Sequence, residues 1–371
     1  MDYSTKFANA LKKYDFSFFG TLSIIFLVGI VNLYSATHAS NESSIANLYK
    51  VQIVWFFLSM AIGVGISFVN PRNFFRFSYI IYLGCIAMLL AVLALGHVGM
   101  GAQRWLGFGS IKFQPSELSK IAVVLVLGRW FVRNNYEHEL SLSDMVIPLI
   151  LTAIPMLLVV VQPDLGTGLL ILLIFSVIAF YKKLKWRSIV VVVLLAMLTG
   201  GVVYKFGLKE YQRQRILTFI DPTADARGFG YNAIQSKIAI GSGQFWGKGF
   251  KKSSQASLSY LPENHTDFIF SIYNEEHGLT GSLLLIFLYI VLLFRFLWLA
   301  GTVSNLYDSI IVIGFMSIFF WHTFINMSMV MGLLPIVGIP LPLMSYGGSS
   351  LLTFFTCAGM ATSISNSRNL F

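Results

Sequence analysis

The sequence predicts an all-α polytopic integral membrane protein with ten transmembrane helices, folded as a single domain over residues 1–371. The first observation is composition: 56% of the residues are hydrophobic and 11% are charged, whereas a soluble domain carries roughly 25% charged residues. The second is a series of apolar runs of about 20 residues, the length that crosses a bilayer as a helix. The third is the content of 33 Phe and 7 Trp, which suits a lipid-facing surface and its interfaces.

Apolar runs taken in chain order give the ten predicted spans, and polar or Pro- and Gly-rich stretches separate them. Residues 207–278, between the seventh and eighth spans, form a large extracytoplasmic loop. Residues 332–349, between the ninth and tenth, contain too much Pro and Gly for one helix and are too apolar for a solvated loop. We expect this segment to re-enter the membrane against the bundle, where irregular backbone is tolerated. The spans are 17–37, 51–70, 77–97, 117–133, 145–162, 166–181, 188–206, 279–298, 308–331 and 350–367.

Basic residues in the short loops predict the orientation of the chain in the membrane. The short loops of the outer side hold few of them, namely Lys50, Arg104 and Lys112. Both termini should therefore be cytoplasmic, and the intervals 207–278 and 332–349 should face outward. The basic residues of the cytoplasmic side are Lys6, Lys12, Lys13, Arg72, Arg76, Arg129, Arg133, Lys182, Lys183, Lys185, Arg187, Arg295 and Arg368.

The net charge of +10 does not indicate nucleic-acid binding, because the basic residues are spread over the loops rather than gathered on one soluble module. Cys85 and Cys357 both lie in apolar runs. We expect buried thiols there, not a disulfide framework or a metal cluster.

Titratable residues with possible chemistry gather at the end of the large outer loop. Glu263, His265 and Asp267 lie immediately before an apolar helix, where partial burial shifts pKa values and can create a reaction centre. The alternative is that Thr266 or Asp267 merely caps the helix that follows.

Charged residues also open two of the predicted spans. Glu117 and Lys120 are three residues apart and so share one helix face. They form either a structural ion pair, with Ser116 as helix cap, or part of a polar cavity, since charges at membrane depth are costly. Asp164 is likewise either a helix cap or a site residue.

Two further motifs in the outer loop bear on phosphate. Arg213 and Arg215 could bind phosphate oxygens bidentately or simply contact lipid headgroups. The Gly-rich stretch 241–249 resembles a phosphate loop but has Ser242 where Gly is required and no Ser or Thr after Lys248. The sequence predicts no tightly bound metal or cofactor, although carboxylates and a pyrophosphate together could hold Mg²⁺ loosely.

Taken in order, the polar motifs resemble those of the SEDS (shape, elongation, division, sporulation) family over essentially the whole chain. Residues 211–215 and 235–243 are more similar to the rod-shape elongation member than to the division member. His277 departs from the family, which usually has Leu in this Glu-Glu-Leu-Gly motif. The motifs are Gln103-Arg104-Trp105, Phe113-Gln114-Pro115-Ser116-Glu117, Gln162-Pro163-Asp164-Leu165-Gly166-Thr167, Leu261-Pro262-Glu263, His265-Thr266-Asp267-Phe268-Ile269-Phe270, Pro340-Leu341-Pro342-Leu343 and Ser345-Tyr346-Gly347-Gly348.

The resemblance implies a peptidoglycan glycosyltransferase that polymerises lipid II at the outer face of the bacterial cytoplasmic membrane, releases undecaprenyl pyrophosphate and supports rod shape. It also implies a class B penicillin-binding transpeptidase as partner. Carried over by position, Asp267 matches the residue regarded as essential in the family. Glu117, Lys120, Arg104 and Asp164 match other polar positions of its outward cavity.

From these residues we expect Asp267 to act as general base on the acceptor hydroxyl. Lys120, held by Glu117, and Arg104 should stabilise the departing pyrophosphate, and a direct catalytic role of Glu117 as an acid stays open. The remaining expected substrate-binding residues are Asp164, Arg213, Arg215, His265 and Ser345. Two other functions remain open: a lipid II flippase, which should carry its site near the midplane rather than on one face, and a non-catalytic activator of the transpeptidase.

Overall fold

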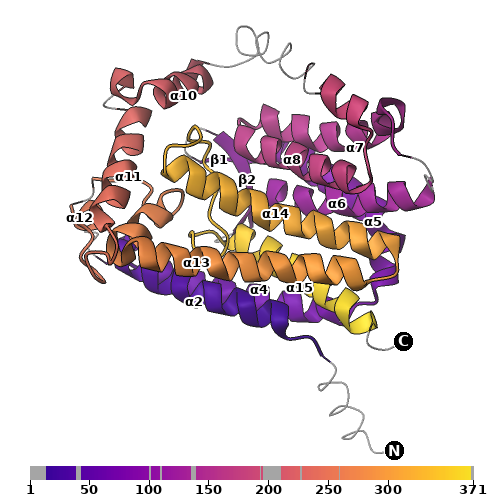
Figure 1. Ribbon diagram of the computed structural model, residues 1–371, viewed down its shortest axis with the longest axis horizontal. Helices are drawn as coiled ribbons and strands as arrows, with labels where there is room; N and C mark the ends of the chain where they lie inside the picture. The colour runs from indigo at the N-terminus through magenta and orange to yellow at the C-terminus, as the bar shows by residue number, and fades with distance from the viewer. Residues whose placement is uncertain are drawn as a thin grey trace, which may run out of the picture.

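Long apolar helices build most of the molecule (Figure 1). The computed structural model describes residues 14–38, 43–99, 102–108, 111–134, 139–192, 194, 210–225, 228–258 and 260–368. Within these residues, six helices are long and apolar enough to cross a membrane. They are α2 (Ser17–Thr37), α4 (Leu48–Ser67), α5 (Pro71–Leu95), α7 (Leu142–Val161), α13 (Ile269–Thr302) and α14 (Leu306–Val330). A polytopic membrane protein is thereby supported.

Two further long helices, α6 (Pro115–Arg133) and α15 (Gly348–Arg368), lie inside the bundle with most of their side chains buried. Helices surrounded by protein need not be uniformly apolar, which explains why α6 carries charged residues. They correspond to the predicted spans 117–133 and 350–367, and α8 (Leu165–Tyr181) corresponds to 166–181. Most of the predicted span 188–206 lies outside the described residues, so the count of ten stays a prediction.

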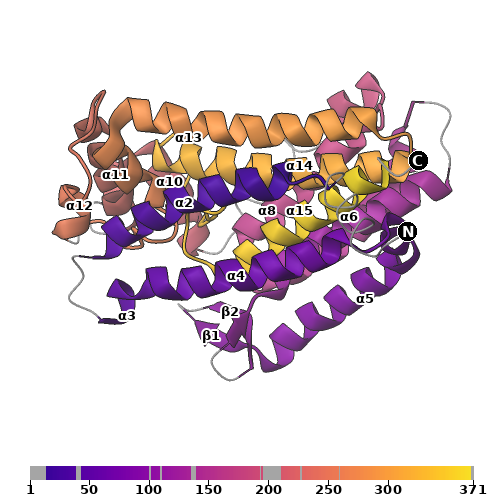
Figure 2. The ribbon, with the colours of Figure 1, turned by 90° about the horizontal axis from the view of Figure 1, so that it is seen from below.

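A small antiparallel sheet corrects the all-α expectation for the loop that follows α5. Its strands β1 (His97–Gly99), β2 (Ala102–Phe108) and β3 (Ile111–Phe113) pair in the order β1-β2-β3. The register places His97 opposite Trp105 and Leu106 opposite Phe113. Strands of three residues are too short to leave an alternating pattern that sequence reading can separate from a loop. The sheet packs beside α5 and α6, which it connects (Figure 2).

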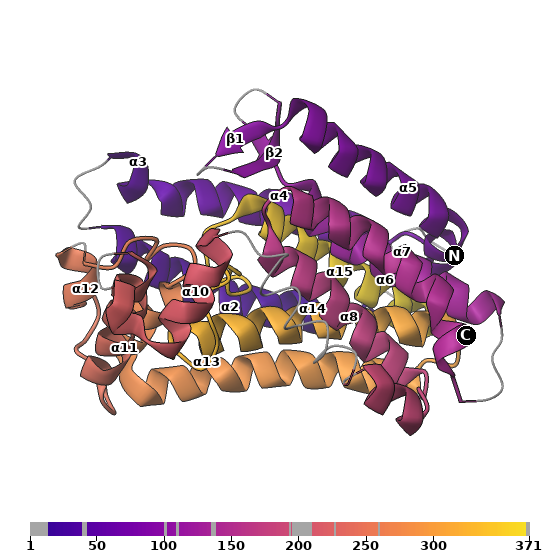
Figure 3. The ribbon, with the colours of Figure 1, turned by 90° about the horizontal axis from the view of Figure 1, so that it is seen from above.

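The predicted outer loop 207–278 is in fact largely helical where the structure describes it. α10, η2 and α11 stand beside one another at one end of the bundle, with α12 next to them (Figure 3). The helix predicted to begin at 279 begins ten residues earlier, at Ile269. Their bounds are α10 Glu210–Ile220, η2 Pro222–Asp225, α11 Phe229–Gly243 and α12 Ser254–Ser257; the four-residue α3 (Ser43–Ala46) precedes α4.

A break inside α13 explains the misplaced start. Gly278 has φ +64° and ψ −161°, a conformation outside the helical region. The turn after α11 docks on this break: the backbone N–H groups of Lys248 and Gly249 each donate to the carbonyls of Glu275 and Glu276, respectively, at 2.9 Å. These bonds satisfy helical carbonyls that the break leaves without intrahelical partners.

Different elements lie at the two ends of the bundle. α10, α11 and α12 gather at one end, and the start of α2 and the end of α15 lie at the other (Figure 1). There the N–H of Asp15 donates to the side chain of Asn366 at 2.9 Å, and Ser365 donates to the Asp15 carboxylate at 2.6 Å. Arg295, near the end of α13, pairs with the same carboxylate. The two termini of the helical bundle are therefore tied together on one side.

The connection between α14 and α15 is irregular, as its Pro and Gly content predicts. Residues 331–347 form turns and extended chain, and Ile339, Leu341 and Leu343 are buried. The segment reaches α2, where a Cβ on Gly29 would lie 2.5 Å from the carbonyl oxygen of Leu343. The connection is therefore packed within the bundle, whereas its contact with lipid stays a prediction. The two cysteines, Cys85 and Cys357, are free and buried, as expected.

Candidate active site

Asp267 lies in the turn immediately before α13 and is partly exposed. A Cβ on Gly338 would lie 3.3 Å from its Oδ2 atom, so the carboxylate faces the backbone of the irregular segment. Phe268 is the N-cap residue of α13. In the part of the chain that the structure describes, no side-chain hydrogen bond caps this helix. The capping alternative for Thr266 and Asp267 is therefore wrong, and the carboxylate is not used to hold the helix end.

Hydrogen bonds fix the backbone around Asp267 against the irregular segment. The Asn326 side chain of α14 donates to the carbonyls of Asp267 at 2.9 Å and of Ile339 at 2.7 Å. The Ser345 hydroxyl donates to the carbonyl of Thr266 at 2.6 Å and is buried. One side chain of α14 and one of the irregular segment thus hold the backbone that carries Asp267. Ser345 therefore has a positioning role in the structure.

Four charged side chains at this end of the bundle act on the carboxyl group of Asp267. Burial and the negative charges of Glu263 and Asp164 raise its pKa, Arg215 and Arg104 lower it, and the net result is a pKa of about 6. A carboxyl group with a pKa near 6 is ionised at neutral pH yet basic enough to accept a proton. The predicted residues Asp267, Arg104, Arg215 and Asp164 are therefore brought together from four different segments.

Arg104 and Asp164 are both held at the start of α8. The Asp164 side chain caps this helix by accepting from the Thr167 N–H at 3.3 Å, and the Thr167 hydroxyl donates to it at 3.0 Å. The Arg104 guanidinium on β2 donates to the backbone carbonyls of Gln162 and Pro163. The capping prediction for Asp164 is confirmed, and its carboxylate also acts on Asp267.

Glu117 and Lys120 form a second, buried polar cluster. The Lys120 ammonium lies 2.8 Å from Glu117 Oε1 and 2.7 Å from Nε2 of His322, and its side chain is fully buried. His322 Nδ1 lies 3.2 Å from the carbonyl oxygen of Pro340, to which it donates, so Nε2 accepts from Lys120. The predicted ion pair is confirmed. The Ser116 cap is wrong, because Gln114 is at the N-cap of α6.

Sequence reasoning missed His322 and Asn326, which lie one turn apart on α14. Both bind carbonyls of the irregular segment, at Pro340 and Ile339, respectively. The available signal was a histidine and an asparagine inside the predicted span 308–331, because polar residues at membrane depth are rare and usually functional.

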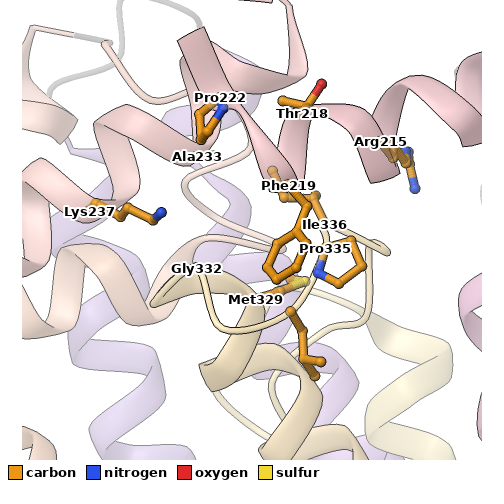
Figure 4. A pocket seen from close by; sticks show the side chains of 11 residues that line it. Arg215, Thr218, Phe219, Pro222, Ala233, Lys237, Met329, Gly332, Pro335 and Ile336 are labelled. Atoms are coloured by element: carbon orange, nitrogen blue, oxygen red, sulfur yellow. The ribbon is translucent and has the colours of Figure 1, made fainter. Parts of the chain in front are cut away.

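The remaining predicted residues lie on α10 and in the turn before α13. Arg213 and Arg215 lie on α10, and both are partly buried. Arg215 lines a pocket between α10, α11 and the irregular segment, which Figure 4 shows at close range. Burial lowers the pKa of His265, while Glu263, 4.0 Å away, raises it. His265 is therefore neutral near pH 7.

Within the described part of the chain, no group of three or more His, Cys, Asp or Glu side chains is arranged to hold a metal ion. Asp164 and Glu263 both act on Asp267 through charge. Carboxylates bind Mg²⁺ in proteins chiefly together with substrate phosphates. A divalent cation held jointly with a diphosphate stays a prediction.

Comparisons with known sequences cover nearly the whole chain. The family model described as Cell cycle protein (FtsW/RodA/SpoVE) matches residues 15–370. The chain is 43% identical over 313 residues to the Escherichia coli K12 protein named Peptidoglycan glycosyltransferase MrdB, with 84% of each covered. It is 30% identical over 429 residues to the Treponema pallidum Peptidoglycan glycosyltransferase RodA, covering 96% of this chain and 98% of that protein.

Solved structures share the same fold. One, described as "Structural coordination of polymerization and crosslinking by a peptidoglycan synthase complex", gives a TM-score of 0.81 at 29% identity, covering 96% of this chain and 98% of that chain. The crystal structure of the Thermus thermophilus rod shape determining protein RodA gives 0.71 at 27% identity, covering 96% and 97%, respectively. The chain therefore belongs to the FtsW/RodA/SpoVE (SEDS) family and is RodA-like within it.

Proposed function

We propose that this chain is a peptidoglycan glycosyltransferase of cell-wall elongation that polymerises lipid II, with Asp267 as general base. The names of its relatives, Peptidoglycan glycosyltransferase MrdB and RodA, support the reaction class. One observation carries the catalytic assignment: Asp267 is a partly exposed residue whose carboxyl group has a pKa of about 6 and feels the charges of Arg104 and Arg215.

The reaction needs a proton acceptor and a place for negative charge. The acceptor sugar hydroxyl attacks the anomeric carbon of the donor, and the bond from that carbon to the diphosphate oxygen breaks with its electron pair going to the diphosphate. The hydroxyl proton passes to Asp267. A positioned base of this kind contributes typically 10²–10⁴-fold. An α-linked donor and a β-1,4-linked product are related by one inversion, so a single displacement suffices.

The other site residues divide into two roles. Arg104 and Arg215 supply positive charge near the departing diphosphate. Arg213, on the same helix as Arg215, and His265 contribute to substrate binding. Glu117 and Lys120 act as a positioning pair beneath the site, because the Lys120 ammonium is fully buried between Glu117 and His322. Removing this pair should disturb the irregular segment, which His322 contacts at Pro340, and should affect the reaction only through that change.

A divalent cation such as Mg²⁺ would enter with the lipid diphosphate. This follows from the carboxylates around Asp267 and from the preference of Mg²⁺ for one or two carboxylates plus substrate phosphates. Chelation by EDTA should then slow polymerisation without lowering the thermal stability of the protein. Loss of stability on chelation would instead indicate a resident ion.

The chain should lie in the bacterial cytoplasmic membrane with both termini inside, beside a class B penicillin-binding transpeptidase. The structural relative solved as a peptidoglycan synthase complex, which coordinates polymerisation with crosslinking, supports such a partner. Co-purification of the two proteins from detergent-solubilised membranes tests the association. Recovery of the chain without the transpeptidase, under conditions that keep it folded, would contradict it.

The decisive test is polymerisation of purified lipid II by the protein together with its partner. Asp267→Asn keeps the shape of the side chain but removes the base, so glycan chains should fall by about two orders of magnitude or more. Asp221→Asn is the matched control, because Asp221 is exposed and accepts from the backbone N–H of Thr223, a bond that Asn can also make.

Near-normal glycan chains from Asp267→Asn would end the base assignment. Lipid translocation without polymer in proteoliposomes of the unmodified protein would instead favour the flippase. Full growth of cells that carry only Asp267→Asn, with the complex assembled, would favour the non-catalytic activator.

A further inference from the structure

A pocket opens between the outer helices and the irregular segment, next to the Asp267 site (Figure 4). Residues of α10, η2 and α11 form one side, and residues 332–336 with the end of α14 form the other. The pocket is partly open to solvent. Arg215 belongs both to this pocket and to the charges that act on Asp267, so the two sites adjoin.

Two cationic side chains flank the pocket from different helices. Lys237 extends toward it from α11, and Arg215 stands across it on α10 (Figure 4). The Lys237 stem lies over Gly332, where a Cβ would come within 1.9 Å of its Cε and 2.6 Å of its Nζ. Gly332, at φ +76°, therefore leaves the room that Lys237 occupies. Two cations on either side of a hollow favour an anion with more than one negative charge.

Apart from Thr218, the other residues that line the pocket are apolar or glycine. Phe219, Pro335 and Ile336 lie between the two cations (Figure 4). Nearby, Ile220 is 74% exposed and Leu333 is 65% exposed. An anion bound here would thus have an apolar surface beside it, which an inorganic ion cannot use but a lipid chain can.

Two other cations of the site are held in place by protein groups. Lys120 is fully buried against Glu117 and His322, and the Arg104 guanidinium donates to two backbone carbonyls. Lys237, by contrast, is an exposed residue. The pocket therefore places an exposed positive charge beside the same hollow as Arg215, and sequence reasoning did not select it.

We propose that Arg215 and Lys237 bind the diphosphate of a polyprenyl lipid in this pocket, with the first isoprenoid units against Phe219 and Pro335. This inference rests on the proposed function and identifies where its leaving group is held. The electron pair of the broken sugar–oxygen bond then resides on a diphosphate that the two cations neutralise.

The test is direct binding of farnesyl diphosphate to the full-length protein in phosphatidylcholine nanodiscs, without any turnover. Arg215→Gln and Lys237→Gln should each weaken binding about tenfold, since each removes a charge-assisted contact. Lys237→Arg should bind nearly as well as the unmodified protein. Lys252→Gln is the control for charge alone, because Lys252 is exposed and does not line the pocket.

Two further binding measurements identify the chemical class of the ligand. Inorganic diphosphate should bind at least tenfold more weakly than farnesyl diphosphate, because it cannot use the apolar wall. Phosphatidylglycerol in the nanodisc should compete only weakly, because it carries a single negative charge. Equal binding of both diphosphates, or strong competition by phosphatidylglycerol, would overturn the lipid diphosphate assignment.

The same preparations separate this inference from the proposed function. Polymerisation of lipid II by the unmodified protein reports on the function, and thermal stability reports on folding of each variant. If the protein polymerises lipid II while folded Arg215→Gln and Lys237→Gln bind farnesyl diphosphate normally, the pocket assignment alone is wrong. If the unmodified protein makes no polymer, the function fails whatever the pocket binds.

Discussion

Asp267 is a carboxylate on which opposing influences act. Burial and the charges of Glu263 and Asp164 disfavour its ionised form, while Arg215 and Arg104 favour it, and its pKa settles at about 6. A lower value would make the group a poor base, and a much higher one would keep it protonated at neutral pH. The two arginines therefore do more than attract phosphate: they keep the base available.

A pH profile follows from this balance. Turnover should fall as the pH drops through about 6, because the protonated carboxyl cannot accept a proton. Arg215→Gln removes a charge that lowers the pKa of Asp267, so the acid limb should move to higher pH. Rates of lipid II polymerisation at saturating substrate, measured on both sides of pH 6, check this. Lys252→Gln should leave the limb in place, and an unmoved limb in Arg215→Gln would contradict the argument.

The buried ion pair of Lys120 and Glu117 should contribute to the stability of the protein. Lys120→Met would leave the buried Glu117 without its cation, and breaking a buried pair in this way costs about 3–5 kcal/mol. The double variant Glu117→Gln with Lys120→Met removes both charges and should recover most of that loss. Apparent melting temperatures and yields of the purified proteins measure the effect. A single variant as stable as the unmodified protein would show that the pair is not structural.

At the scale of elements, the break in α13 controls where the outer helices meet the bundle. The N–H groups of Leu279 and Thr280 donate to the carbonyls of Gln244 and Phe245 at 2.8 and 3.1 Å. Together with the bonds on the other side of Gly278, they turn the break into a joint between α13 and the turn after α11. This joint fixes α11, and with it Lys237, relative to the helix that begins beside Asp267.

Gly278→Ala tests that joint. The backbone there has φ +64°, and a Cβ would lie 2.4 Å from the backbone N of Gly247 and 2.6 Å from the carbonyl oxygen of Phe245. We expect a loss of at least about 2 kcal/mol, seen as a lower apparent melting temperature. Gly301→Ala is the control on the same helix, since nothing lies within 4 Å of a Cβ there. Equal stability of the two variants would refute the joint.

The elements that sequence reading placed well are those whose signal is local. Apolar runs located α2, α4 and α14 to within a few residues, because lipid-facing length is decisive. Sequence reading missed the three-residue strands, because so short a strand shows no alternating pattern. It also missed the early start of α13, because the glycine at the break inside this helix is typical of a helix end. The inner helices α6 and α15 were placed although their buried faces tolerate polar residues.

The site was predictable by residue but not by geometry. Asp267, Arg104 and Asp164 stood out as polar residues next to apolar runs, yet their mutual influence depends on contacts between distant segments. The bond between Asn326 and the backbone of Asp267 joins residues 59 positions apart, a pairing that no local pattern reveals. For the same reason, the burial of Lys120 against His322 could not be read from the sequence.

Across the whole molecule, the arrangement of the two ends predicts how the chain sits in the membrane. The site and the helices α10 to α12 lie at one end, and the ties between Asp15, Arg295 and Ser365 lie at the other (Figure 1). Short-loop basic residues place the second end in the cytoplasm. Lipid-linked sugars at the outer face would then meet the site without crossing the bundle.

Cysteine labelling tests this orientation, because the native Cys85 and Cys357 are buried and should give little background. Ser257→Cys, at the exposed end of α12, should react with a membrane-impermeant maleimide added to intact spheroplasts. Asn134→Cys, exposed after α6, should react only once the membrane is permeabilised. The reverse pattern would place Asp267 on the cytoplasmic side, away from outward-facing lipid II, and polymerisation at the outer surface could not be its function.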